Sequence, residues 1–219
     1  AEFAAAVAAH LRGRGRAAVD AIALTVGETA ALPPELLETG PASGRLWEPP
    51  AWLRGHQGLL PPPALGPALD LGCGSGRACV WLAELGYRVT GIDHQAEALA
   101  LGARLAASRG VGCRFVQADL RRPDALAGDG WGTVVNVRFL HRPLLPRLAS
   151  LVVPGGVVLI RTFREAPGYA GHPRPRHRLR RGELLAAFPR PLWTVLAHQE
   201  DHDADGRPVA GIVARRLAG

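Results

Sequence analysis

The sequence predicts an α/β protein with a doubly wound, mostly parallel sheet of seven strands, completed by a C-terminal antiparallel hairpin. Between residues 68 and 163, short apolar segments of strand length alternate with segments of helical periodicity, as in a parallel sheet with helices on both faces. After residue 190, two strand-like segments follow each other with only a turn between them, which predicts the hairpin. A chain of 219 residues, 47% of them hydrophobic, is long enough for one such domain and an appendage.

The chain divides at about residue 45. Residues 1–45 are rich in alanine, with apolar side chains at helical spacing, and predict an N-terminal helical appendage and the start of a connector. Prolines and glycines are frequent over residues 33–67, so an irregular connector is expected there. Residues 46–219 form the predicted main domain.

Within this domain each element has its own signal. Strands are predicted where apolar or alternating residues end in a turn or an acid, and helices where apolar residues recur every three or four positions. The predicted strands are 68–73, 87–93, 113–119, 133–140, 157–163, 192–200 and 208–216, and the predicted helices are 76–86, 96–108, 143–151 and 182–188.

Composition limits the function classes. No run of about 18 uncharged apolar residues is present, so no membrane partner or membrane span is predicted. The three cysteines lack the spacing of a metal site or a disulfide framework, which predicts no bound metal and fits a reducing, cytoplasmic location. The net charge of +7 makes anionic partners plausible, although a soluble enzyme with an arginine-decorated surface has the same charge.

A glycine-rich turn follows the first predicted strand, in the sequence Asp70-Leu-Gly72-Cys73-Gly74-Ser-Gly76-Arg77. Glycines let the backbone approach a ligand closely, and the following helix start offers unpaired N–H groups. Arg77 stands where the dinucleotide fingerprint needs a small residue. Asp70 would repel a pyrophosphate, but it suits a ligand that carries an ammonium and a sulfonium. The predicted ligand is therefore S-adenosylmethionine.

Two further acids stand at successive strand ends. Asp93 closes the second strand and is predicted to accept from the ribose hydroxyls, while Asp119 closes the third and is predicted to accept from the adenine amino group, beside Leu120. The predicted cofactor-binding residues are Asp70, Gly72, Cys73, Gly74, Gly76, Asp93, His94, Asp119, Leu120 and Asn136.

With these acids in order, the chain resembles class I S-adenosylmethionine-dependent methyltransferases. RLWEPPAWL at 45–53, ALDLGCGSGR at 68–77, RFLHRPLLPRL at 138–148, LVVPGGVVLIRTF at 151–163 and RRGELL at 180–185 are most similar to bacterial methyltransferases of the tellurite-resistance type. The resemblance implies a Rossmann-like methyltransferase fold over residues 46–219 and S-adenosylmethionine-dependent methyl transfer. Gly132 replaces the usual Asp, and no (N/D)PP(Y/F) motif is present, which argues against amino-directed nucleic-acid methylation.

The acceptor side is predicted from residues after the fourth and fifth strands. His141 is the candidate base and Arg138 a second catalytic candidate, although a helix-start histidine also serves as a cap. The arginine-rich segment 161–181 is expected to form a lid over the acceptor; a solvated surface loop is the alternative. The predicted substrate-binding residues are Trp47, Arg142, Arg161 and Tyr169.

Three functions remain open. The preferred one is methyl transfer to a small-molecule acceptor that is anionic or a thiol or chalcogen compound. An RNA-modifying methyltransferase is the second, since the chain is basic, but nucleic acid is not favoured as a partner because no separate RNA-binding module is evident. A non-catalytic S-adenosylmethionine-binding protein is the third. The chain is expected to be a monomer or a homodimer.

Overall fold

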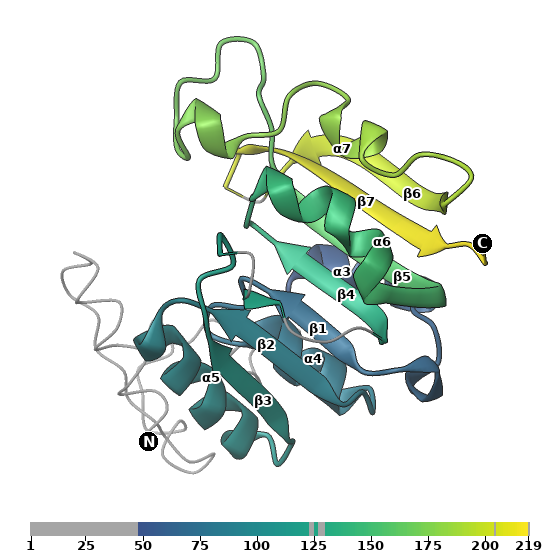
Figure 1. Ribbon diagram of the computed structural model, residues 1–219. Helices are drawn as coiled ribbons and strands as arrows, with labels where there is room; N and C mark the ends of the chain where they lie inside the picture. Colours follow the sequence, from purple (N-terminus) through teal and green to yellow (C-terminus); the bar gives the residue numbers. More distant parts are fainter. Residues whose placement is uncertain (1–47, 123–124, 127–129, 204, 219) are drawn as a thin grey trace, which may run out of the picture.

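The computed structural model describes residues 48–122, 125–126, 130–203 and 205–218 (Figure 1). Its centre is a seven-stranded sheet in the order β3-β2-β1-β4-β5-β7-β6. Strands β1 to β5 are parallel, and β5-β7-β6 are antiparallel, as the sequence predicts. The strands are β1 (Ala68–Leu71), β2 (Val89–Asp93), β3 (Cys113–Gln117), β4 (Trp131–Val137), β5 (Val152–Phe163), β6 (Trp193–His202) and β7 (Pro208–Arg216).

Two hydrophobic clusters cover the two faces of the sheet. Alternation along β5 separates them, since Val157 and Leu159 belong to one cluster, with α3 and α4, and Val158 and Ile160 to the other, with α6 and α7. The α-helices are α3 (Ala51–Gly55), α4 (Arg77–Glu84), α5 (Ala96–Ser108), α6 (Leu148–Leu151) and α7 (Glu183–Ala186). The 3-10 helices are η2 (Gln57–Leu59), η3 (Pro63–Leu65), η5 (Arg142–Arg147) and η6 (Pro175–His177).

Some predicted elements differ in detail. The helix expected over 143–151 is a 3-10 helix followed by one turn of α-helix, because Pro146 lacks the N–H that a continuous α-helix requires. Strand β4 ends before Arg138, whose φ of 62° lies outside the strand region. The connector contains α3 where irregular backbone was expected. The predicted appendage, residues 1–45, lies outside the described residues.

The strand order fixes where a ligand site is expected. The chain moves outward from β1 to β3 and then crosses back to place β4 beside β1, so the winding direction reverses between β1 and β4. Open α/β sheets bind ligands at the carboxyl ends of the strands next to this reversal. In the part of the chain that the structure describes, no helix is long and apolar enough to cross a membrane.

Candidate active site

The glycine turn connects β1 to α4 at the reversal point. Gly72, Gly74 and Gly76 have φ values of 72°, 52° and 71°, a conformation that residues with a Cβ adopt at a cost. A Cβ on Gly72 would lie 2.8 Å from Phe139, whereas a Cβ on Gly74 would meet no atom within 4 Å. The glycines therefore permit both the close packing of the turn and an open approach to its backbone.

Asp93 ties this turn to the end of β2. Its carboxylate accepts hydrogen bonds from the backbone N–H groups of Gly74, at 2.9 Å, and Gln95, at 3.0 Å. The Nδ1 atom of His94 lies 3.2 Å from the same carboxylate. Oδ1 and Oδ2 each retain acceptor capacity, so Asp93 can also accept from a ligand hydroxyl.

Asp70 lies deeper, at 2% exposure, where it accepts a hydrogen bond from the Cys79 thiol at 3.4 Å. Burial raises the pKa of Asp70 to about 7; the negative charge of Asp93 adds to the rise, and the Cys79 hydrogen bond opposes it. A cation brought close to Asp70 would favour its ionised form.

Asp119, after β3, has a different environment. Its half-exposed carboxylate accepts hydrogen bonds from the Arg121 side chain at 2.8 to 3.1 Å, which lowers the pKa of Asp119 to about 2. Leu120 beside it is buried.

The carboxyl ends of β1 to β5, together with η5 and η6, surround a cavity of about 630 Å³. Gly72, Asp93, His94, Asp119 and Leu120 line the side nearest the glycine turn. The opposite side is lined by Arg138, Phe139, Leu140, His141, Arg142, Phe163, Pro173, Arg176 and His177. A second cavity, of about 370 Å³, is lined by Asp70, Cys73, Gly74, Ser75 and Arg77, and it shares Gly72 and Arg138 with the first.

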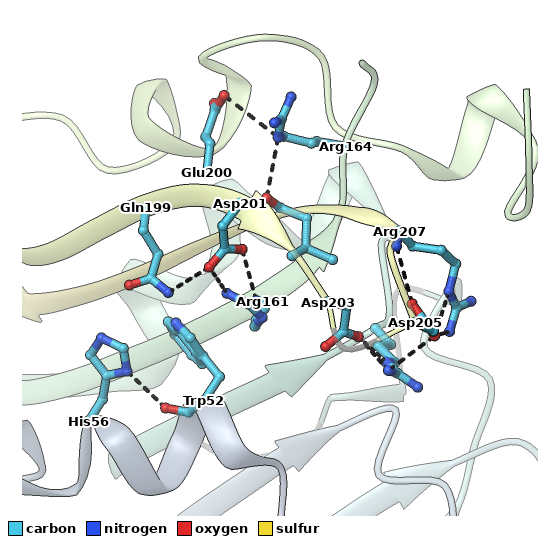
Figure 2. A network of polar contacts seen from close by, with 12 residues as sticks. Trp52, His56, Arg161, Arg164, Gln199, Glu200, Asp201, Asp203, Asp205 and Arg207 are labelled. Carbon is cyan, nitrogen blue, oxygen red and sulfur yellow. Dashed lines mark hydrogen bonds and ion pairs between the residues drawn. The ribbon is translucent and has the colours of Figure 1, made fainter. Parts of the chain in front are cut away.

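Two of the predicted arginines line the large cavity but are already paired. Arg138 donates through Nε to Asp203 at 3.0 Å and lies 3.7 Å from Asp205, in the β6–β7 turn (Figure 2 shows both acids). Arg142 binds both carboxylate oxygens of Glu183, which lowers the pKa of Glu183. Direct binding of an acceptor by either guanidinium therefore competes with an existing ion pair.

Arg142 also holds the loop that borders the cavity. It donates to the backbone carbonyls of Arg176, at 3.0 Å, and Arg178, at 2.7 Å. Since Glu183 accepts the backbone N–H of Arg180 at 2.7 Å, the segment 176–180 is attached to η5 and α7 through one ion pair.

Other predicted substrate residues lie away from this cavity. Arg161 points to the α3 face, donating to Asp201 at 2.8 Å with its guanidinium 5.7 Å from the Trp52 ring centroid (Figure 2). Tyr169 donates to the carbonyl of His172 at 2.7 Å and stacks under Arg178. Trp47 lies outside the described residues. Asn136 is buried in β4, and its Oδ1 has no hydrogen-bond partner among the described residues.

Sequence analysis missed two aromatic residues that line this cavity, Phe139 and Phe163. Phe139 lies two residues after β4, which borders the reversal point, and Phe163 ends the next strand, β5; these positions are the signal that the sequence offers. Within the described residues, no group of three histidine, cysteine, aspartate or glutamate side chains could hold a metal ion.

Comparison with known proteins shows what this part of the chain is similar to. Residues 68–156 match the profile of the family described as "Methyltransferase domain". The chain is 32% identical over 111 residues to ribosomal RNA small subunit methyltransferase C of Alcanivorax borkumensis, covering 47% of this chain and 34% of that protein. It is 33% identical over 100 residues to ubiquinone biosynthesis O-methyltransferase of Cronobacter sakazakii, covering 43% of this chain and 41% of that protein. The matches thus span less than half of either relative.

Solved structures share the fold. TehB from Haemophilus influenzae superposes with a TM-score of 0.60 at 21% identity, covering 75% of this chain and 60% of that one. An S-adenosylmethionine-dependent methyltransferase from Mesorhizobium loti superposes with a TM-score of 0.57 at 22% identity, covering 76% and 98%. Profile and fold confirm the predicted class. Residues 68–156 match the methyltransferase-domain family, and the fold is shared with S-adenosylmethionine-dependent methyltransferases of known structure.

Proposed function

We propose that this chain transfers a methyl group from S-adenosylmethionine to a small acceptor that is an oxyanion or a thiol or chalcogen compound. The observation that carries the proposal is the cavity of about 630 Å³, which has the glycine turn and Asp93 on one side and a basic, partly aromatic wall on the other. Methyl transfer requires the donor and the acceptor to be held close together, and a cavity with these two sides can hold both.

The residues beside the turn fit the donor. When bound, S-adenosylmethionine supplies a methyl group activated by its sulfonium. Gly74 leaves the backbone open to a ligand, Asp93 offers acceptor capacity to a ribose, and Asp70 offers a buried carboxylate to positive charge. Asp119 and the apolar Leu120 line the same side and suit an adenine ring.

The opposite wall supports an anionic acceptor. Arg138 and Arg142 are already paired with acids, whereas Arg176 makes no ion pair within the described part of the chain. Its Nε donates to His177 at 3.0 Å, which leaves the two terminal NH2 groups of the guanidinium for a ligand. Arg176 and His177 are therefore our candidates for binding the acceptor anion, and Arg142 positions them.

His141 is our candidate base. It lines the cavity, and its ring makes no hydrogen bond among the described residues. A neutral imidazole can take the proton of a thiol or chalcogenol as its lone pair attacks the methyl group. An acceptor that is already fully ionised needs no base, and the imidazole then contributes only contact.

RNA methylation is a second candidate. The similarity to an rRNA methyltransferase and the net charge of +7 support it. The two candidates differ in salt dependence, because RNA binding releases counterions and weakens steeply as salt increases.

Calorimetry with S-adenosylhomocysteine tests the donor site. We expect the wild-type chain to bind and Asp93→Ala to lose on the order of tenfold to a hundredfold in affinity, the effect of removing a charged hydrogen-bond acceptor. Glu97→Gln, on the exposed side of α5, is the matched control and keeps wild-type affinity. No binding at millimolar ligand would refute the proposal.

Labelled donor then tests the acceptor. A panel of thiols, selenite, tellurite and amines is incubated beside bulk tRNA and rRNA. Methylated small molecules support the first candidate, whereas methylated RNA with salt-sensitive binding supports the second. A chain that binds the donor but methylates nothing is the non-catalytic protein that the sequence also allows.

We also propose that residues 46–219 form one methyltransferase domain, because all seven strands between residues 68 and 216 share one sheet. Limited proteolysis of the full chain should then cut first before residue 46. Early cuts within the strands would contradict this boundary.

A further inference from the structure

Two cysteines meet beneath the glycine turn, at a glycine of β2. A Cβ built on Gly91 would lie 2.6 Å from the Sγ of Cys79 and 2.9 Å from the Sγ of Cys73. Both sulfurs therefore lie close to the same point, the position of that Cβ. The distance between the two sulfurs is shorter than the sum of the two distances to it. Cys73 belongs to the turn, while Cys79 lies in the first turn of α4.

The two thiols differ in access and in partners. Cys73 is 9% exposed and lines the cavity of about 370 Å³, whereas Cys79 is completely buried and donates to Asp70 at 3.4 Å. The hydrogen bond with Cys73, followed by burial and the nearby Asp70, raises the pKa of Cys79 well above its ordinary value. Cys79 therefore remains a protonated thiol beside a carboxylate that can receive its proton.

We propose that Cys73 and Cys79 form a peroxide-sensitive disulfide site that controls ligand binding at the glycine turn. Cys73, which a small peroxide can reach from the cavity, is the sulfur oxidised first. Cys79 is the resolving thiol, and Asp70 is the base that accepts its proton. Neither thiol takes a chemical part in the methyl transfer proposed above.

The steps balance. The Cys73 thiol attacks one oxygen of hydrogen peroxide, the O–O bond breaks, and one water leaves, so that Cys73 becomes a sulfenic acid. The Cys79 sulfur then attacks the Cys73 sulfur, its proton passing to Asp70, and the S–O bond breaks. The departing hydroxide takes up that proton as a second water. Two thiols are oxidised to one disulfide, and one peroxide is reduced to two waters.

The disulfide would change the shape of the turn. Its sulfurs must approach to about 2.05 Å with a fixed torsion, so the turn residue Cys73 has to move toward α4. Gly74, whose N–H binds Asp93, follows Cys73 directly, and the movement would disturb that contact. We expect S-adenosylhomocysteine to bind the oxidised chain at least about tenfold more weakly, a loss comparable to that of one good hydrogen bond.

Thiol counting by mass spectrometry tests the site in the full chain, and it needs no methyl donor. The reduced chain carries three thiols that can be alkylated after denaturation. After peroxide, we expect only Cys113 to be alkylated, with recovery of all three upon reduction by dithiothreitol. Cys113→Ser is the matched control and should lose both remaining thiols in the same way.

Variants separate the steps. In Cys79→Ser, or in Cys79→Ala if that variant is more stable, dimedone should trap a sulfenic acid on Cys73 that does not accumulate in the wild type. In Asp70→Asn, the same adduct should appear and the disulfide should form at least about tenfold more slowly, as expected for loss of a general base. Peroxide should not change the affinity of Cys73→Ala for S-adenosylhomocysteine, whatever its starting value.

Three results would each overturn the proposal. The first is retention of all three thiols at peroxide concentrations that oxidise free glutathione. The second is a disulfide that includes Cys113. The third is an oxidised chain, with the Cys73–Cys79 bond verified by peptide mapping, that binds S-adenosylhomocysteine as tightly as the reduced chain does.

Discussion

Replacing Gly91 by alanine tests the packing beneath the glycine turn. Gly91 is paired with Asp70 of β1 on one side and Phe115 of β3 on the other, so the backbone of β2 cannot withdraw. The added Cβ would lie 2.6 Å and 2.9 Å from the sulfurs of Cys79 and Cys73, where ordinary contacts begin at 3.4 Å. Both sulfurs must therefore move by several tenths of an ångström inside a packed core.

Overpacking of this kind costs about 1–3 kcal/mol, and we expect the upper half of that range because two buried atoms are displaced. Urea unfolding measures the cost as a lower midpoint at an unchanged slope. Gly58→Ala is the control, since a Cβ there meets no atom within 4 Å, and it should be neutral or slightly stabilising.

The double variant Gly91→Ala, Cys79→Ala should cost less than the sum of the single variants, by about 1 kcal/mol, because the second change removes one of the clashing atoms. A cost below about 0.5 kcal/mol for Gly91→Ala would refute the placement of the sulfurs, since that is within the range of surface substitutions.

Three further predictions concern the charged residues. Because burial raises the pKa of Asp70 to about 7, the folded chain keeps a proton that the unfolded chain releases near pH 3.9, so the free energy of unfolding should fall as pH rises from about 4 to about 7. Urea unfolding of Asp70→Asn over this pH range should show a smaller dependence of that free energy on pH. An unchanged dependence would contradict the prediction. The ion pair of Arg142 with Glu183 is partly exposed, so Arg142→Met should cost about 1–2 kcal/mol of local stability, measured as faster hydrogen exchange in residues 176–180. Because the pair lowers the pKa of Glu183, its contribution to stability is present at neutral pH and is lost as acid protonates Glu183. Arg176→Gln should raise KM for an anionic acceptor on the order of tenfold with an unchanged Kd for S-adenosylhomocysteine, whereas equal effects on both ligands would assign Arg176 to general loop structure.

The sequence predicts the sheet well because the pattern that encodes a buried parallel strand is local. Four consecutive buried residues in β1 and the short, mostly buried segment of β2 around Gly91 require only a few positions to recognise. The helix near Pro146 was predicted too regular, since its apolar spacing is helical but two prolines remove backbone donors.

Arg161 shows why side-chain roles are harder to predict than strands. It follows the apolar run of β5, and the sequence suggested a place in the acceptor wall. Its position in the alternation puts it on the face of Val157 and Leu159, where Trp52 and Asp201 surround it. Its ion-pair partner is 40 positions away in the chain, and no local pattern announces that pairing.

The same distinction separates the two sides of the cavity. The proposed donor side is encoded within 51 residues of sequence, from Asp70 to Leu120, and depends on backbone turns and on carboxylates that end or follow three strands. The acceptor side depends on ion pairs that span 65 positions for Arg138 and 41 for Arg142. Because these pairs neutralise two of the arginines in the wall, the number of arginines there overstates the positive charge that a bound ligand meets. Among the described residues, Arg176 has no ion-pair partner, and we therefore expect acceptor specificity to follow changes in the pairing more than changes in the number of arginines.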